Sequence, residues 1–458
     1  MLRCCDNLSS ILDVTHTPDS ARATERSTAL LTDKYELTML EAALRDGTAA
    51  RRVTCEVFAR RLPNERRYGV VAGTDRAPHA VRDFRFNEEQ IAELDFLEEG
   101  TKQYLRDYRF SGQIDGYREG ELYFPKSPLL TVHGTFGECV ILETVLLSIM
   151  NSDSAVASAA SRMVTAADGR PIIEMGSRRT HEYAAVTAAR AAYLAGFSAT
   201  SNREAGFRYG IPVSGTAAPA WTLSRSKAAR TPNEEAAFRS QIESLGVDTV
   251  LLVDTYDITK GVEPAVRVAG PQLGGVRIDS GDLGAVTRRV RKQLDDLGNH
   301  NTQIVVSSDL DEFAIAGLRG DPVDVYGVGT SVVTGSGAPT AGMVYKIVEV
   351  EGHPVAKRSS SKRSQAGAKQ SLRTYRSTGV AVEEVVFPYG EAAPDTGSLS
   401  AREITIPLMR DGEIVPGLAS LEESRTYLAE ARKTLPWEGL ALTRDEPAVP
   451  TRMVGFKV

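Results

Sequence analysis

Four apolar runs between residues 248 and 331 each end in acidic, hydroxyl or glycine residues, and this recurrence most strongly constrains the fold. The polar endings are residues 254–257, 279–282, 307–311 and 327–331. The third ending precedes a short helical pattern, and the second precedes an amphipathic segment whose apolar face comprises Val286, Val290, Leu294 and Leu297. Strands that alternate with helices build parallel sheets, whose carboxyl ends share one edge. The sequence therefore predicts an α/β barrel or a large open sheet over about 170–345, with a ligand site at that edge.

The ending at 275–282 is the richest in charge. An apolar run closes on a fixed cation and two carboxylates, which makes Arg277, Asp279 and Asp282 candidate site residues. A plain helix-capping loop is the alternative, because Ser and Asp favour helix starts. Capping needs one such residue, whereas this turn has three charged groups and Ser280, so the pattern favours a site.

Glycines and arginines near the other endings favour an anionic ligand. Gly327, Gly329 and Thr330 follow a strand and offer unobstructed backbone N–H groups with one hydroxyl, an arrangement that suits phosphate. Arg178 and Arg179, which end another apolar run, add fixed positive charge. The aspartates can hold ribose hydroxyls or a hydrated Mg²⁺, which prefers one or two carboxylates together with phosphate oxygens. These patterns predict a phosphorylated or acidic ligand.

Length and composition restrict the class of protein. A chain of 458 residues exceeds what one core usually holds, so two domains are expected. Hydrophobic residues make up 42% and charged residues 25%, as in ordinary globular proteins. The net charge of −6 gives no support for a nucleic-acid surface. No apolar run approaches the roughly 20 residues that span a bilayer, so no membrane partner is expected.

Four domain-level segments follow from the patterning. Residues 1–27 are rich in Ser, Thr and Arg and predict a flexible extension. Residues 28–136 predict a mixed α/β domain, and 137–346 the α/β barrel. Residues 347–458 contain a basic loop around 358–373, strands that rejoin the first domain from about 350–410, and a terminal helix.

The cysteines indicate a reducing compartment. The four thiols, at Cys4, Cys5, Cys55 and Cys139, have no metal-ligand spacing beyond one adjacent pair, and no secretory signal precedes them. The cytoplasm is therefore the expected location. The six histidines include none placed as an obvious base. Cleavage at a sugar anomeric carbon needs no strong base, because it expels an anionic leaving group that the protein stabilises.

Several of these motifs, taken together, resemble the nicotinate phosphoribosyltransferases. They lie in that family's order over about residues 28–440, at 31–35, 174–179, 200–202, 215–216, 276–282 and 327–331. The resemblance implies the type II phosphoribosyltransferase fold, an irregular α/β barrel beside a mixed α/β domain. It also implies that nicotinate and phosphoribosyl pyrophosphate give nicotinate mononucleotide and pyrophosphate in NAD salvage, with ATP and Mg²⁺ as co-substrate and cofactor.

The same resemblance implies roles for individual residues. Tyr35 would stack on the pyridine ring and reach a neighbouring subunit's site across a homodimer, although packing is the better interpretation of this residue taken alone. Arg277 would hold nicotinate, Asp279 a ribose hydroxyl, and Arg178 the pyrophosphate or the ring. The remaining implied ligand-site residues are Thr216 and Thr330, with Gly327 and Gly329 at the 5′-phosphate.

Pro219 departs from the family pattern. The family has a phosphorylatable histidine three residues after the threonine of its Gly-Thr motif, and here that position follows Thr216 as Pro219. Proline has no nucleophilic nitrogen, so ATP coupling is predicted to be lost or badly impaired. His181 is the nearest histidine in sequence, and its helical setting predicts a structural role.

Three alternatives stay open at the level of sequence. A nicotinamide-using relative of the same fold shares the motifs, and Arg277 alone does not separate the two substrates. A decayed paralogue that binds ligand as a partner subunit is favoured by Pro219. A generic barrel enzyme that acts on sugar phosphates is disfavoured by the ordered set of motifs.

Overall fold

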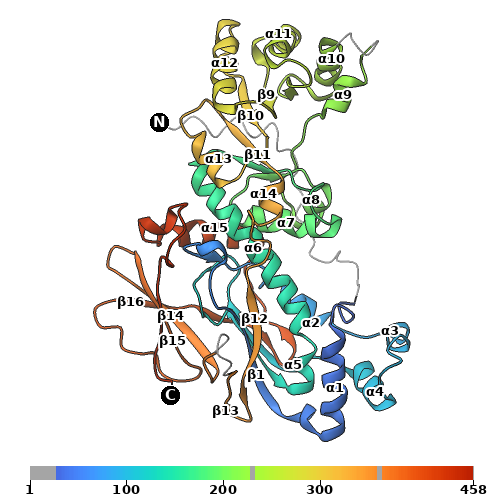
Figure 1. Cartoon of the computed structure of the whole chain (residues 1–458), viewed down its shortest axis with the longest axis vertical. Coiled ribbons are helices and arrows are strands. Elements are labelled where there is room, and N and C mark those ends of the chain that lie inside the picture. The colour runs from blue at the N-terminus through green and yellow to red at the C-terminus, as the bar shows by residue number, and fades with distance from the viewer. Residues whose placement is uncertain (1–26, 227–232, 358–363, 457–458) are drawn as a thin grey trace. The chain divides into compact units, whose positions relative to one another are not determined.

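The computed structural model describes residues 27–226, 233–357 and 364–456, which fall into two compact units (Figure 1). Among the described residues, the barrel unit comprises Ala159–Gly337, and the mixed unit comprises those up to Ser158 and from Ala338 onward. The flexible extension predicted for residues 1–27 lies outside the described residues except for Ser27. Residues 137–158, which the sequence groups with the barrel, belong to the mixed unit.

A parallel sheet of six strands forms the barrel unit, in the order β7-β6-β11-β10-β9-β8. The strands are β6 (Ile172–Glu174), β7 (Ala199–Thr200), β8 (Val250–Leu252), β9 (Gly275–Ile278), β10 (Gln303–Val306) and β11 (Val325–Val328). Every neighbouring pair is parallel, so the carboxyl ends lie along one edge. Among the described residues, no ladder closes β7 onto β8. The predicted irregular α/β barrel is confirmed in this open form.

Helices follow the strands, and polar residues between the strands and helices cap several of them. They are α7 (Glu182–Leu194), α8 (Arg203–Tyr209), α9 (Pro219–Leu223), α10 (Glu234–Leu245), α11 (Ile258–Ala269), α12 (Leu283–Asp296), α13 (Glu312–Gly317) and α14 (Thr330–Val333). Asp257, Asp282 and Asp311 accept backbone N–H bonds at the starts of α11, α12 and α13. Part of the polar signal at the strand ends is therefore helix capping.

Helix α12 buries the apolar face that its spacing predicts. Val286, Val290 and Leu294 are buried. Leu297 is 43% exposed because it follows the last helical residue, where the face no longer continues. The predicted face is correct over the helix and wrong at this one residue.

An antiparallel sheet of seven strands organises the mixed unit, in the order β13-β12-β1-β5-β3-β17-β18. The strands are β1 (Arg52–Ala59), β3 (Gln113–Tyr117), β5 (Leu130–Thr135), β12 (Met343–Val350), β13 (His353–Pro354), β17 (Thr405–Arg410) and β18 (Glu413–Ile414). β12 pairs with β1, and β17 pairs with β3. Strands from the last third of the chain therefore pair with strands from its first third.

Short helices and a second sheet complete this unit. The helices are α1 (Lys34–Asp46), α2 (Arg76–Arg82), α3 (Glu88–Ala92), α4 (Glu99–Asp107), α5 (Phe136–Val140) and α15 (Leu421–Lys433), with α6 (Glu143–Ala167) running across the division at Ala159. A four-stranded sheet contains β14 (Lys369–Tyr375), β15 (Ala381–Pro388), β16 (Ser400–Glu403) and β19 (Thr451–Met453), and β2 (Gly69–Val70) pairs with β4 (Leu122–Tyr123). The apolar cluster of the unit packs around Leu40, Val57, Tyr117 and Leu142.

The prediction of a basic loop around 358–373 is wrong for the last residues of that range. Residues 358–363 lie outside the described structure, but Lys369 and Arg373 belong to strand β14 and are buried. Lys369 Nζ lies 2.8 Å from Glu56 Oε2, and Arg373 contacts two carboxylates. The charge run suggests solvation because its acidic partners come from distant parts of the sequence.

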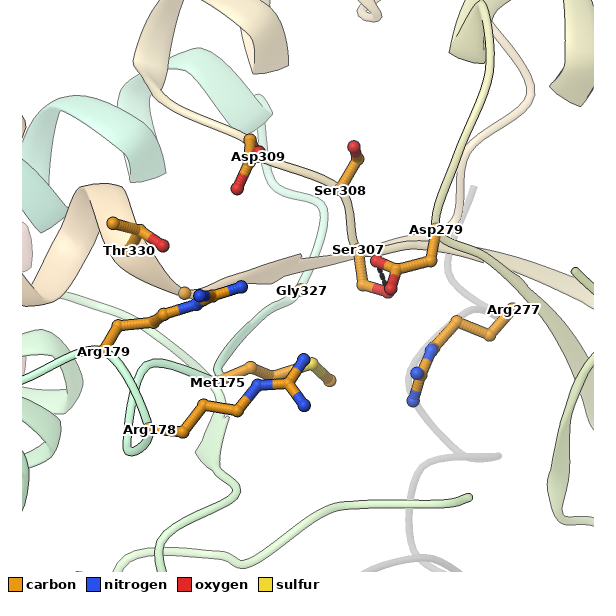
Figure 2. A pocket seen from close by; sticks show the side chains of 11 residues that line it. Met175, Arg178, Arg179, Arg277, Asp279, Ser307, Ser308, Asp309, Gly327 and Thr330 are labelled. Atoms are coloured by element: carbon orange, nitrogen blue, oxygen red, sulfur yellow. Dashed lines mark hydrogen bonds between the residues drawn. The ribbon is translucent and has the colours of Figure 1, made fainter. Parts of the chain in front are cut away.

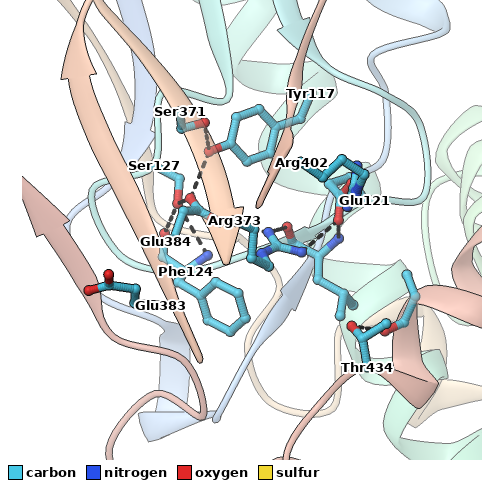
Figure 3. Close-up of polar contacts among 12 residues, drawn as sticks. Tyr117, Glu121, Phe124, Ser127, Ser371, Arg373, Glu383, Glu384, Arg402 and Thr434 are labelled. Atoms are coloured by element: carbon cyan, nitrogen blue, oxygen red, sulfur yellow. Dashed lines mark hydrogen bonds and ion pairs between the residues drawn. The ribbon is translucent and has the colours of Figure 1, made fainter. Parts of the chain in front are cut away.

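Arg373 is the centre of a buried ionic network (Figure 3). Its guanidinium donates to Glu121 Oε1 at 2.8 Å and to Glu384 Oε2 at 2.6 Å. Further donors complete both carboxylates: Tyr117 Oη donates to Glu384 at 2.7 Å, Tyr427 Oη donates to Glu121, and Arg402 Nη2 donates to Glu121 Oε2 at 2.9 Å. Burial alone would lower the pKa of Arg373, but these carboxylates raise it above its usual range, so the cation is retained.

Candidate active site

The carboxyl ends of β6, β9, β10 and β11 surround one hollow in the barrel unit (Figure 2). Its lining residues are Met175, Arg178, Arg179, Arg277, Asp279, Ser307, Ser308, Asp309, Gly327, Gly329 and Thr330. Each follows or ends one of these strands, so the parallel topology brings together side chains that are far apart in the sequence. The predicted ligand edge therefore contains a pocket lined by both cationic and anionic side chains.

Two adjacent arginines form one wall of the hollow. Arg178 and Arg179 follow β6, are exposed, and extend along the hollow in Figure 2. Within the described structure, neither guanidinium donates a hydrogen bond or forms an ion pair. Guanidinium groups match phosphate and carboxylate oxygens in geometry and charge, so this wall suits an anion.

Arg277 is held differently, in a half-buried setting opposite these arginines. Its Nη1 donates to Thr216 Oγ1 at 3.3 Å, and its buried Nε has no partner among the described residues. Desolvation lowers the pKa of Arg277, and Asp279 and Asp254 act in the opposite direction. A desolvated cation with an unused donor is costly unless an acceptor arrives. The position therefore favours binding of an anionic group.

Asp279 is fixed by its neighbours on adjacent strand ends. Ser307 Oγ donates to Asp279 Oδ1 at 2.9 Å, the dashed line in Figure 2. The backbone N–H of Asp279 donates to Asp254 Oδ2 at 2.6 Å, and burial raises the pKa of Asp254. One oxygen of Asp279 is thus committed to Ser307, and no described residue donates a hydrogen bond to the other.

The two glycines of β11 and its end have different reasons to be glycine. A Cβ at Gly327 would lie 2.7 Å from Met175 Sδ and 2.9 Å from Ser307 Cβ, so packing alone excludes a side chain there. At Gly329 the nearest atom to such a Cβ would be Met175 O at 3.2 Å, a tighter contact than is usual. Gly329 also lines the hollow with its backbone. Close approach of the turn after β6 thus explains Gly327 without a ligand.

The pocket contains seven of the residues singled out from the sequence, namely Arg178, Arg179, Arg277, Asp279, Gly327, Gly329 and Thr330. Thr216 adjoins it through its bond to Arg277. Asp282 is not a lining residue; its Oδ1 accepts from the N–H of Ala285 and caps α12. The structure therefore gives Asp282 a structural role of its own.

Tyr35 belongs to the mixed unit, on helix α1, where it is 46% exposed. Desolvation, with the nearby Glu143, raises the pKa of Tyr35 to about 12, so the phenol stays neutral. Pro219 is the first residue of α9, a position where proline fits because the missing N–H would be unpaired. His181 caps α7 through its Nδ1, in agreement with the structural role expected for it.

Four lining residues have no individual role assigned from the sequence, namely Met175, Ser307, Ser308 and Asp309. The strand-end signal that marks Asp279 also marks 307–309, so the same reasoning extends to these residues. Met175 carries no comparable signal, because an apolar side chain at a strand end is usually core. Its place follows only from the turn that packs against Gly327.

Comparison with solved structures defines the class as type II phosphoribosyltransferase. The human nicotinic acid phosphoribosyltransferase matches with a TM-score of 0.79 and 25% identity, covering 92% of this chain and 97% of that one. A nicotinate-nucleotide pyrophosphorylase from Pyrococcus furiosus matches with a TM-score of 0.75 and 25% identity, covering 91% and 99%. Both matches extend over nearly the whole of each chain.

Sequence relatives narrow the class to one family. Residues 30–151 match the model of the nicotinate phosphoribosyltransferase N-terminal domain. Nicotinate phosphoribosyltransferase pncB1 of Mycobacterium tuberculosis is 59% identical over 428 residues, which cover 93% of this chain and 95% of the relative. The nicotinate phosphoribosyltransferase of Bacillus subtilis is 40% identical, covering 71% and 67%. The chain belongs to the nicotinate phosphoribosyltransferase family. Among its described helices, none has both the length and the apolar content to cross a membrane.

Proposed function

We propose that this chain joins nicotinate to phosphoribosyl pyrophosphate, forming nicotinate mononucleotide and releasing pyrophosphate in NAD salvage. The observation that carries the proposal is a pocket with three arginines, none of which forms an ion pair with a described residue, beside two carboxylates. Both substrates are anions, and the names of relatives up to 59% identical point to the same reaction. A nicotinamide-using relative is the alternative, because Arg277 alone does not separate the two bases.

Positioning and charge stabilisation account for the chemistry. Positive charge develops on the sugar as pyrophosphate leaves its anomeric carbon, so no strong base is required. In this proposal Arg178 and Arg179 stabilise the leaving pyrophosphate, Arg277 orients the nicotinate carboxylate, and the pyridine nitrogen attacks the anomeric carbon. The free oxygen of Asp279 accepts a hydrogen bond from a ribose hydroxyl.

The carboxylates of the pocket fit Mg²⁺ that arrives with the substrate. The described residues contain no group of three or more His, Cys, Asp and Glu side chains able to hold a metal alone. Asp279 and Asp309 nevertheless supply the one or two carboxylates that Mg²⁺ uses alongside phosphate oxygens. Bound there, Mg²⁺ would neutralise part of the charge on the leaving pyrophosphate.

ATP coupling is proposed to be lost or badly impaired in this chain. Pro219 occupies the position of the family's phosphorylatable histidine and sits in a local structure suited to proline. This loss is compatible with survival of the uncoupled transfer. A decayed paralogue that binds ligand as a partner subunit is the second candidate, and Pro219 is the observation that favours it.

Synthesis of nicotinate mononucleotide from purified chain, assayed with and without ATP, tests these proposals together. The expected result is product formation that ATP does not increase, with nicotinate preferred over nicotinamide in direct competition. Labelled ATP should leave no acid-labile phosphohistidine on the wild-type chain. Absence of pyrophosphate release with either base would instead support the decayed paralogue.

A homodimer and a cytoplasmic location remain part of the proposal. Exposed apolar side chains on and beside α1 support a subunit contact there, namely Leu30, Leu31, Tyr35, Met39 and Phe96. The two described cysteines, Cys55 and Cys139, are free thiols, which supports a reducing compartment. Cys4 and Cys5 lie outside the described residues.

A further inference from the structure

Glu174, at the end of β6, is a buried carboxyl group with no cationic partner among the described residues. It is 1% exposed, and its hydrogen bonds come only from neutral donors. Oε1 accepts from the backbone N–H of Gly176, and Oε2 accepts from Thr200 Oγ1 at 2.5 Å. A carboxyl group is expensive to bury, so a requirement for two acceptors at this point explains why it is retained.

These two bonds join the turn after β6 to the end of β7. Thr200 Oγ1 also accepts from the N–H of Asn202 at 3.0 Å, and Asn202 Nδ2 donates to Ser177 Oγ at 3.0 Å. A backbone hydrogen bond joins the same two segments, because the N–H of Ser201 donates to Glu174 O at 2.8 Å. Residues 174–177 are therefore held at both ends by β7 and the start of α8.

The turn held in this way is the one that carries the two pocket arginines. Ser177 precedes Arg178 directly, and the N–H of Arg179 donates to Gly176 O at 2.8 Å. The turn also packs closely on the opposite wall, because a Cβ at Gly176 would lie 2.8 Å from Gly329 O. Since no described residue bonds the guanidinium groups, their direction depends on this backbone.

We propose that Glu174 is a positioning residue that holds the 175–179 turn, and so directs Arg178 and Arg179 toward the phosphorylated substrate without touching it. The proposal rests on the proposed function for the identity of the substrate. It assigns the tie formed by Glu174 and Thr200 a role in anion affinity, in addition to stability. Thr200 and Ser177 belong to the same chain of hydrogen bonds. Thr200 bonds Glu174 directly, and Ser177 is linked to Thr200 through Asn202.

Inorganic pyrophosphate binding, measured by calorimetry on the full chain, tests the proposal without requiring turnover. Glu174→Gln loses one acceptor and Thr200→Val loses the hydroxyl, so each should weaken pyrophosphate binding by about tenfold or more, at least about 1.4 kcal/mol. Thr200→Ser keeps the hydroxyl and is the matched control, with wild-type affinity expected. Glu174→Gln combined with Thr200→Val should be no weaker than the worse single variant, because both break one shared bond.

Kinetics separate positioning from general destabilisation. The KM for phosphoribosyl pyrophosphate should rise in Glu174→Gln and Thr200→Val while the KM for nicotinate stays unchanged. Ser177→Ala removes only the last bond of the path, keeps the buried carboxyl intact, and should weaken pyrophosphate binding in the same direction by a smaller factor. Should the buried variants fail to fold, Ser177→Ala alone decides the proposal.

Unchanged pyrophosphate affinity in folded Glu174→Gln and Thr200→Val, or in Ser177→Ala where those do not fold, would overturn the proposal. An equal loss in Thr200→Ser would overturn it as well, since that variant keeps the tie. Failure of the proposed function looks different: wild-type chain would bind pyrophosphate yet form no nicotinate mononucleotide. In that case the affinities of the variants still decide the role of Glu174.

Discussion

The arginines of the two units are used in opposite ways. Arg373 in the mixed unit is 1% exposed and bonded to two carboxylates, which are completed by tyrosine hydroxyls (Figure 3). Arg178 and Arg179 in the barrel unit are exposed and bond to no described acceptor, and Arg277 keeps one buried N–H unpaired among the described residues (Figure 2). The mixed unit satisfies its cation internally, whereas the barrel unit leaves its cations for an external anion.

This difference separates residues that maintain the fold from residues that serve a ligand. A buried cation whose donors meet carboxylates cannot be removed without leaving those carboxylates unpaired. A cation that is desolvated or lies near other cations, and has no acceptor of its own, destabilises the fold slightly. It gains a partner only when an anionic ligand binds. Substitution of Arg373 should therefore reduce stability, whereas substitution of the pocket arginines should reduce activity and leave stability unchanged or higher.

Arg373→Met should give the largest effect. It tests whether the internally paired cation of the mixed unit maintains the fold. It leaves Glu384 buried without its cation and Glu121 with only the ion pair to Arg402, at a cost of about 3–5 kcal/mol of unfolding free energy. Urea denaturation measures the loss. Arg402→Met is the matched control, because Arg402 contacts the same Glu121 with a side chain that is 41% exposed and should cost far less. Equal losses in the two variants would remove the distinction.

Arg277→Met should show the reverse pattern. Loss of one charge-assisted substrate contact should lower kcat/KM by about a hundredfold or more, as for a single charge-stabilising donor. Stability should be unchanged or higher, because the substitution removes a desolvated cation whose Nε has no described partner. Steady-state kinetics and thermal unfolding on the same preparation measure both quantities. A destabilised but fully active variant would reverse the comparison for this residue.

Glu234 extends the comparison to a buried carboxyl group of the barrel unit. Burial, with Asp257 and Asp254 nearby, raises the pKa of Glu234 to about 7, and its Oε1 has no described partner. Because the folded state then binds the proton more tightly than the unfolded state, the stability that Glu234 contributes is present at low pH and lost as pH rises to about 7. Glu234→Gln should flatten that dependence and be more stable at pH 8 by about 1.4 kcal/mol or more, the equivalent of one pKa unit. An unchanged pH profile of stability would contradict the assignment.

Asp282 gives the smallest expected effect and decides between capping and catalysis. Asp282→Ala should cost about 1 kcal/mol because it removes the cap of α12. Asp282→Asn keeps a capping oxygen, so it should retain both stability and turnover. Thermal unfolding and kcat measure the pair. A large fall in kcat for Asp282→Asn at normal stability would restore the catalytic role predicted from the sequence.

Strand ends are the part of the site that local patterning can predict. Parallel strands send their carboxyl ends to one edge, so the sequence by itself groups Arg277, Asp279 and Gly329 in one place. Local patterning cannot decide which polar residue caps a helix, and it consequently assigns Asp282 to the site. It also fails at β14, where Lys369 is neutralised by Glu56, which lies 313 residues away in the chain.

The fold is predictable to the extent that each segment buries its own apolar face. The parallel strands and α12 follow from apolar patterning, and so does the returning strand β17, whereas β12 begins inside the segment that the sequence groups with the barrel. The boundary between the two units cannot be predicted in this way, because α6 is continuous across Ala159 and shows no break in composition there. Met175 becomes part of the site only through close packing against Gly327, which no local pattern reports.

Calorimetric titration of phosphoribosyl pyrophosphate into wild-type chain and into the Arg178→Ala, Arg179→Ala double variant tests the central claim most directly. Each lost charge-assisted contact is worth about 1.5–3 kcal/mol, so the double variant should bind at least about a hundredfold more weakly. Its thermal stability should match that of the wild type. Unchanged affinity in the double variant would contradict the claim that these uncompensated arginines form the anion site.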